Sequence, residues 1–129
     1  MITVAILGIL VSVALPSYQD QVVRTRRAAA AGCTMELAQF MERVYASNLR
    51  YDQNNGVATA LPAVPCRNEL AASYTFDFAA AQPSGRTFTV VATPAGAQAS
   101  RDAKCKALSI DQANVKGISG TGTVAQCWR

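Results

Sequence analysis

Residues 1–22 read MITVAILGILVSVALPSYQDQV, and the first charged side chain among them is Asp20. Nine strongly apolar residues lie between Met1 and Pro16, and they favour membrane insertion by about 3–5 kcal/mol in total. A helix of sixteen residues rises about 24 Å, which is roughly one turn short of the ~30 Å hydrocarbon core. We therefore expect a helix that enters lipid with modest, reversible affinity.

A cleaved secretory signal is the alternative interpretation of this segment. Such a signal begins with basic residues and ends in a small-residue cleavage site. Here no Lys or Arg precedes the apolar run, and the run continues through Pro16 into a helical pattern. Arg24, Arg26 and Arg27 follow the span, so a simple positive-inside count places the rest of the chain in the cytoplasm.

The four cysteines indicate the opposite side of a membrane. Their spacings are long, and the chain has no histidine to complete a zinc site. Two disulfides in an oxidising compartment are the better interpretation, and free buried thiols are the alternative. Three pairings are possible. We favour Cys33 with Cys66 and Cys105 with Cys127, because each closes a local loop.

Composition argues against an enzyme. The 129 residues suffice for one domain with a modest core. Without histidine, Ser17, Ser109 and Ser119 have no partner of the usual kind to activate them. The stretch SGTGT at 119–123 lacks the lysine of a phosphate-binding loop. We predict no catalytic residue, no cofactor and no metal.

The helical pattern extends well beyond the apolar span. Its apolar positions follow the spacing of one helix face and predict a helix from about Ile2 to about Leu49. Gly8 and Pro16 interrupt its first half, where Pro16 cannot donate to the carbonyl of Ser12. This interruption predicts either an ordinary kink or a functional hinge. The positions that form the apolar face are Cys33, Leu37, Phe40, Met41, Val44 and Tyr45.

Turn residues and alternating patterns follow the helix. Residues 51–73 predict a loop pinned by Cys66. Residues 74–78 and 87–93 alternate as strands, joined by a hairpin connection at 82–86. Further strands are expected at 107–113 and 124–128. Together these elements predict an α+β fold in which an antiparallel sheet covers the second half of the helix, with an apolar half-helix at 1–22 and a globular domain at 23–129.

Both ends of the chain carry a family resemblance. Residues 1–22 resemble the start of a mature type IV pilin, where an apolar segment with a glycine and a helix-bending proline leads into Ser-Tyr-Gln-Asp. Residues 104–128, KCKALSIDQANVKGISGTGTVAQCW, resemble the end of PilE-type minor pilins, which finish at Cys-Trp. Residues 50–100 match only in outline. We expect Trp128 to pack on the sheet edge, with an adhesive contact as the alternative.

The chain departs from the family pattern at its front. Members of the family are made with a short basic leader ending in glycine, which a prepilin peptidase removes before a Phe-Thr-Leu-Ile-Glu type sequence. Met1 stands just after the position of that opening segment. We hypothesise that the sequence is truncated there, and that the missing residues supply the turn by which the span is short.

The resemblance implies a structural subunit of a type IV pilus, made by an ATPase-driven assembly machine in the bacterial inner membrane and then part of an extracellular filament. The filament would serve motility, adhesion or DNA uptake. Once withdrawn from lipid, the apolar segment has to be buried against the same segment of other pilin subunits. The residues expected to carry assembly are Ile2, Val4, Ile6, Leu7, Gly8, Ile9, Leu10, Val11, Val13, Leu15 and Pro16.

Two other pilin functions stay open. A DNA-binding competence pilin would contact phosphates through basic side chains, although a net charge of only +4 favours ordinary solvated charges instead. A type II secretion pseudopilin would need a calcium site, yet only Asp102 and Asp111 lie beyond residue 77. The candidate DNA or surface contacts are Arg86, Arg101, Lys104, Lys106 and Lys116.

Overall fold

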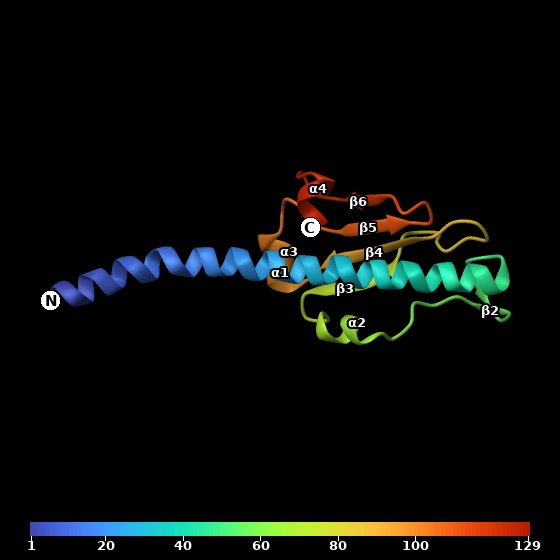
Figure 1. Ribbon diagram of the computed structural model, residues 1–129, viewed down its shortest axis with the longest axis horizontal. Helices are drawn as coiled ribbons and strands as arrows, with labels where there is room; N and C mark the ends of the chain where they lie inside the picture. Colours follow the sequence, from blue (N-terminus) through green and yellow to red (C-terminus); the bar gives the residue numbers. More distant parts are fainter.

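A computed structural model describes residues 1–129, and its longest element is the helix α1, Ile2–Asn48. Pro16 does not break it. The helix ends where Leu49 takes a left-handed conformation, with φ 56°, and its N–H donates to the carbonyl of Tyr45. In Figure 1 the first half of α1 stands free, while the second half lies along a globular part. The helix predicted from the sequence is thus confirmed over almost its full length.

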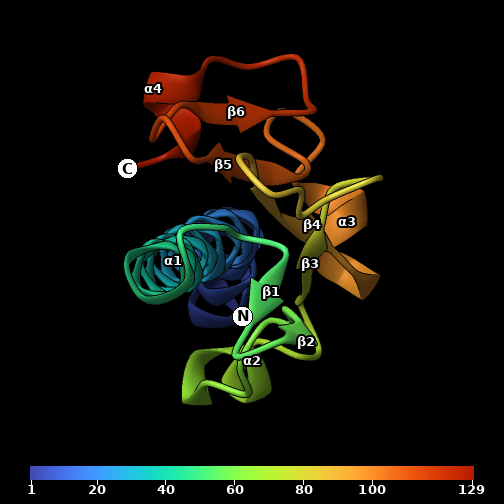
Figure 2. The same ribbon diagram turned by 90° about the vertical axis from the view of Figure 1, so that its right-hand side faces the viewer.

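A four-stranded antiparallel sheet covers the second half of α1 (Figure 2). Its strands follow one another in chain order because each pairs with the next. The register places Phe76 opposite Ala92 and Val90 opposite Ile110, so apolar side chains of neighbouring strands share the inner face. The strands are β3 (Tyr74–Phe78), β4 (Thr89–Pro94), β5 (Leu108–Asp111) and β6 (Lys116–Ile118).

The segment between α1 and the sheet is less irregular than predicted. It contains a small hairpin of β1 (Gln53–Asn54) and β2 (Val57–Ala58) and a short helix, α2 (Pro65–Glu69). Proline at the first helical position suits α2, because its missing N–H has no partner there anyway. A second short helix, α3 (Gly96–Arg101), follows β4.

The strand predicted at 124–128 is wrong. These residues instead form the helix α4, Val124–Cys127, and the last strand is β6. The Oγ1 of Thr123 accepts a hydrogen bond from the N–H of Gln126 at 3.3 Å, which caps the start of α4. β6 escaped prediction because it is three half-buried residues long and contains Gly117, so it shows no alternation.

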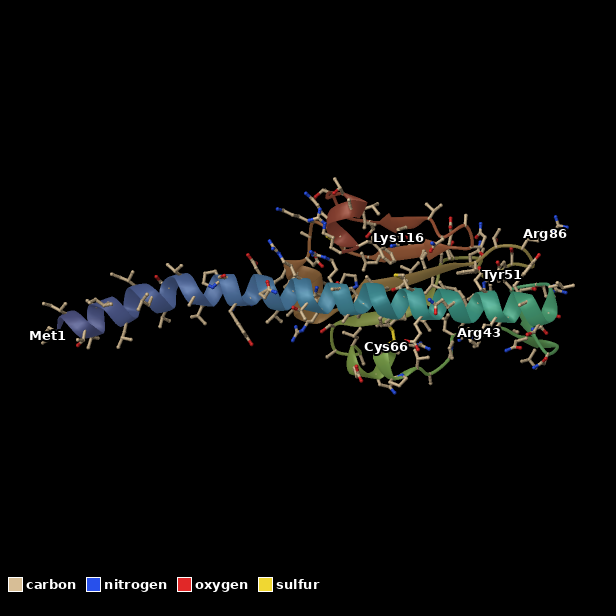
Figure 3. The ribbon with its side chains drawn as sticks, in the orientation of Figure 1. Met1, Arg43, Tyr51, Cys66, Arg86 and Lys116 are labelled. Carbon is tan, nitrogen blue, oxygen red and sulfur yellow. A yellow bond between two sulfur atoms is a disulfide. The ribbon has the colours of Figure 1, made fainter.

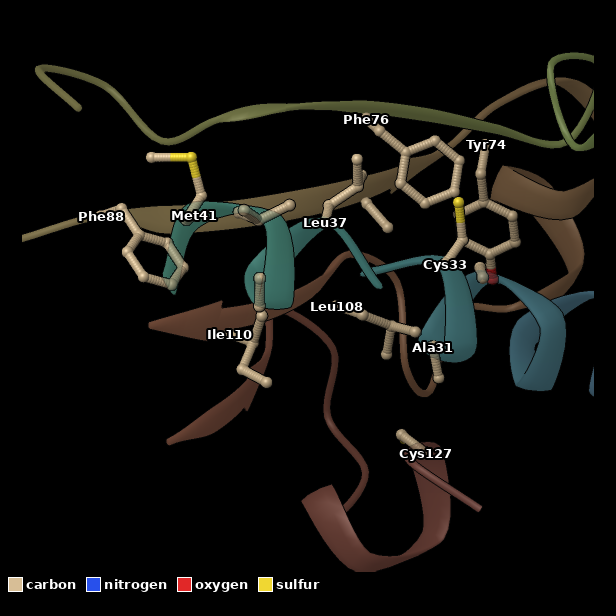
Figure 4. Packing of buried hydrophobic residues seen from close by; sticks show 14 of the residues in the cluster. Ala31, Cys33, Leu37, Met41, Tyr74, Phe76, Phe88, Leu108, Ile110 and Cys127 are labelled. Carbon is tan, nitrogen blue, oxygen red and sulfur yellow. The ribbon is translucent and has the colours of Figure 1, made fainter. Parts of the chain in front are cut away.

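The core lies between the predicted apolar face of α1 and the inner face of the sheet (Figure 4). Leu37 and Met41 of α1 are completely buried, as are Val90 and Leu108 of the sheet. Burial of each large side chain contributes roughly 1.5–3 kcal/mol. Phe40 and Tyr45 complete the face as partly buried neighbours of the core.

Two disulfides hold the peripheral segments on this core. Cys33 of α1 is bonded to Cys66 of α2, and Cys105 is bonded to Cys127 of α4. These are the pairs favoured from the loop lengths. For sequence separations of 33 and 22 residues, the entropy of loop closure corresponds to about 3–4 kcal/mol of stabilisation for each bond.

Candidate functional site

The free half of α1 is a helix without a partner. Residues 1–21 are all exposed, and none of the nine large apolar side chains up to Leu15 contacts the globular part. Those side chains point in every direction around the helix (Figure 3). A helix that is apolar all round is normally buried in protein or lipid. By length and composition, α1 as a whole is long and apolar enough to cross a membrane.

The predicted assembly residues, from Ile2 to Pro16, all lie on this free half. Gly8 has open space around its Cα, and Ser12 Oγ donates to the carbonyl of Ile9 at 2.7 Å. That bond uses the hydroxyl one turn before Pro16, where the proline removes a backbone hydrogen bond. The helix nevertheless continues without interruption. The hinge interpretation therefore stays a prediction.

A buried polar cluster fixes the point where α1 enters the globular part. Arg27 Nη1 lies 2.7 Å from Asp102 Oδ1, and the Tyr74 hydroxyl donates to Asp102 Oδ2 at 3.3 Å. Gln98 Nε2 donates to the carbonyl of Val23, to Tyr74 and to Asp102 at 3.1–3.2 Å. These contacts tie α1, β3 and α3 together, so the free half leaves the domain from a fixed base.

Burial in this cluster raises the pKa of Tyr74 to about 12, and the nearby Asp102 carboxylate acts in the same direction. Sequence reasoning missed the cluster. Val23 and Gln98 are 75 residues apart, as are Arg27 and Asp102, and nothing in the local pattern signals their contact.

The predicted basic residues do not form one surface. Arg86 lies on the hairpin between β3 and β4, at the far end of the globular part from Met1 (Figure 3). Arg101 ends α3 beside the free half of α1. Lys104 and Lys106 flank Cys105, and Lys116 lies on β6. The structure thus separates Arg86 from the other four.

The C-terminal segment brings three of these lysines into one region. The N–H groups of Gly120 and Gly122 donate to the carbonyls of Cys105 and Lys104, at 3.1 and 2.7 Å. Lys116 Nζ lies 5.2 Å from the centre of the Trp128 ring, a cation–π distance. We call four basic residues the C-terminal basic surface: Lys104 and Lys106 flank Cys105, Lys116 lies near Trp128, and Arg129 follows Trp128 in the chain.

Trp128 packs as predicted. Its indole N–H donates to the carbonyl of Gly117 at 3.0 Å, and its ring lies against the core. All four cysteines are in disulfides, and no three His, Cys, Asp or Glu side chains gather closely enough to hold a metal ion.

Comparisons with known proteins agree with this geometry. Residues 16–109 match the profile of a protein family described as type IV minor pilin ComP, DNA uptake sequence receptor. A type IV pilin from Shewanella oneidensis has a similar structure, with a TM-score of 0.55, 23% identity, and coverage of 83% of this chain and 98% of that one. The non-core minor pilin PilV of Neisseria meningitidis gives a TM-score of 0.52 at 19% identity, with coverage of 80% and 92%. No curated protein matches the chain.

Proposed function

The chain belongs to the type IV minor pilin ComP family and is a type IV pilus subunit, and on that premise we propose that its residues 2–16 assemble it into the filament. One observation carries this proposal: the free half of α1 is apolar on every side and exposed along its whole length. Burying a large apolar side chain is worth roughly 1.5–3 kcal/mol. Nine such side chains make exposure of this segment to water unfavourable by on the order of 10 kcal/mol or more, so it has to be covered by lipid or by other subunits.

The same segment explains both environments of the subunit. Before assembly it spans the bacterial inner membrane, and the assembly machinery then withdraws it into the extracellular pilus. In the pilus, the apolar helices of neighbouring pilins replace the lipid. Because the globular part covers only the second half of α1, each free half meets different surfaces of different neighbours. Such head-to-tail contacts do not close, so they produce a filament.

Two substitutions of the same kind test this role. Leu10 and Leu49 are both exposed on α1 or at its end, but only Leu10 lies on the free half. We expect Leu10→Asp to remove the subunit from the pilus, because a charge in the filament centre has no compensating partner. Leu49→Asp should assemble normally. Electron microscopy and mass spectrometry of sheared surface fibres measure both.

The Leu10→Asp chain has to be shown to fold. Formation of both disulfides and resistance of the globular part to protease supply that control. Leu10→Asp subunits present in fibres at the unmodified level would contradict the proposal.

A second proposed function is DNA capture by the same subunit. The matching family is described as a DNA uptake sequence receptor. This description favours DNA binding, whereas the net charge of +4 taken alone argued against it. We infer that the C-terminal basic surface contacts DNA phosphates. The Cys105–Cys127 disulfide and the Gly120 and Gly122 hydrogen bonds hold this surface in place, so its cations need little ordering on binding.

Salt dependence tests this second function. We measure duplex DNA affinity at several salt concentrations for three proteins in detergent. They are the full chain, the double variant Lys104→Gln/Lys116→Gln and the charge-matched control Arg24→Gln/Arg43→Gln. Each lost phosphate contact should lower the slope of log K against log salt by about 0.9. The first pair should therefore reduce the slope by roughly 2 for any duplex, and the control should not change it. If the unmodified chain fails to shift a duplex at low salt, DNA capture is excluded.

A further inference from the structure

A cleft lies where α1 leaves the globular part, between residues of α1 and α3; Figure 1 shows these two helices next to each other at that point. We call it the neck cleft. Its volume is about 180 Å³, and apolar residues (Val22, Val23 and Ala97) line it together with Tyr18, Gln19, Arg26, Gln98 and Arg101. The polar cluster of Arg27, Asp102 and Gln98 keeps α3 on α1, so the two walls of the cleft are held at a fixed separation.

The two arginines of the neck cleft carry unpaired charge. Arg27 is neutralised by Asp102, whereas Arg26 and Arg101 take part in no ion pair, and their side chains donate no hydrogen bond within the chain. Asp20 is the nearest carboxylate along α1, and it does not line the cleft. Guanidinium groups bind phosphate with paired hydrogen bonds and keep their charge at any physiological pH. An anion with phosphate oxygens therefore fits this charge.

Gln98, a residue of the cleft wall, has one buried acceptor without a donor. Its side chain is 1% exposed, and its Nε2 already serves three acceptors, while its Oε1 has no donor. Buried polar atoms normally have hydrogen-bond partners. This oxygen is itself enclosed, so an anion in the cleft is held by the two arginines and not by Gln98.

The position of the cleft along α1 selects the source of the phosphate. The apolar run ends at Pro16, and the first charged residue after it is Asp20, so in a membrane-spanning helix the interface lies between these two positions. Tyr18 then lies at the membrane interface, where tyrosines concentrate. Arg26 is about 12 Å further along the axis than Tyr18, and helical side chains lean toward the N-terminus, which here is the membrane side. The neck cleft thus faces the headgroup layer.

We propose that the neck cleft binds the headgroup of an anionic phospholipid, such as phosphatidylglycerol, while the subunit is in the membrane. This inference rests on the membrane-anchored state proposed above. Arg26 and Arg101 hold the phosphate. The bound lipid fixes the height and orientation of the globular part over the membrane before the subunit is withdrawn.

Nanodiscs that contain the full chain test the proposal. We measure thermal unfolding of the globular part by Trp128 fluorescence, in phosphatidylcholine alone and with added phosphatidylglycerol. A ligand that binds only the folded state raises the midpoint, and we expect a rise of about 3 °C or more. Arg26→Gln/Arg101→Gln should abolish the rise. Arg43→Gln/Arg86→Gln removes the same charge at the far end of the domain (Figure 3) and should keep it.

Three results would overturn the inference. Equal unfolding midpoints in both lipid mixtures exclude a headgroup site. If both double variants lose the rise in midpoint equally, the protein is attracted only diffusely to a charged surface. In phosphatidylcholine discs, a response to soluble glycerol 3-phosphate or to a DNA duplex, with none to phosphatidylglycerol, assigns the cleft to that ligand instead. Failure of the chain to enter either disc overturns the membrane-anchored state itself, and that failure is seen before any midpoint is measured.

Discussion

Asp102 is the only charged residue that is buried, and its environment shows why it is tolerated. Its carboxylate accepts from Arg27, Tyr74 and Gln98, so both oxygens have partners. Charges in protein interiors persist when they are paired and hydrogen-bonded. The cluster also spans three elements, and its loss would release α3 from α1.

We expect Asp102→Ala to lower the free energy of unfolding by about 3 kcal/mol, because it leaves Arg27 and the Tyr74 hydroxyl without their acceptor. Arg50→Gln is the control, since the Arg50–Asp52 pair is exposed and exposed pairs add little. Urea denaturation measures both. A similar small effect of the two substitutions would show that the cluster does not stabilise the fold.

Tyr74 predicts a pH dependence at the alkaline end. Tyrosine in an unfolded chain ionises near pH 10, whereas burial raises the pKa of Tyr74 to about 12. Between these values the folded state keeps a proton that the unfolded state has lost, so stability falls as pH rises. The fall from pH 9 to pH 11 should be smaller in Tyr74→Phe. An equal fall in both proteins would contradict a raised pKa of this tyrosine.

The cluster marks the limit of inference from sequence at the level of single residues. The cysteine pairing could be favoured because loop length has a physical cost that the sequence displays. Contact between Arg27 and Asp102 depends on how α3 docks, and no local pattern encodes that docking. Gln98 gave no signal for the same reason.

Hydrophobic periodicity predicted the helices and strands correctly where one face of the element is buried. The α1 stripe from Cys33 to Val44 meets the sheet, and the alternation in β3 and β4 places Phe76 and Val90 inside. It failed at the C-terminal end, where Thr123 caps a helix and a disulfide holds it. There, capping and a covalent bond determine the local structure, so hydrophobic alternation carries no information.

Gly120 shows how closely that end is packed. A Cβ at this position would lie 2.1 Å from the carbonyl oxygen of Lys104, which is backbone and has little freedom to move. We expect Gly120→Ala to push residues 119–122 away from Lys104, to destabilise the domain by about 1–3 kcal/mol, and to weaken DNA binding. Gly85→Ala is the control, because a Cβ there meets only one atom, at 4.0 Å. Unfolding midpoints and a gel shift measure the two effects, and a Gly120→Ala chain as stable as the control would refute this packing argument.

The whole molecule joins two parts with different surroundings. The α+β class and the covered half of α1 followed from sequence, because the apolar pattern changes from all-round to one-sided along a single helix. The position of the neck cleft did not follow, since it depends on the angle at which α3 meets α1. On our proposal the two parts have different roles: the free half contacts lipid or neighbouring helices, and the globular part displays the basic surface.

A variant that begins at Asp20 should separate these two roles. Residues 1–19 are exposed and belong to no part of the core cluster, whose first member is Ala30. Removing them also leaves the bond from Gln98 to Val23 intact. We therefore expect a protein that is monomeric without detergent and that unfolds within about 0.5 kcal/mol of the full chain. Light scattering and urea denaturation check this, with the full chain in detergent as the reference. Aggregation of the shortened protein, or a large loss of stability, would mean that the free half supports the fold and is more than an assembly segment.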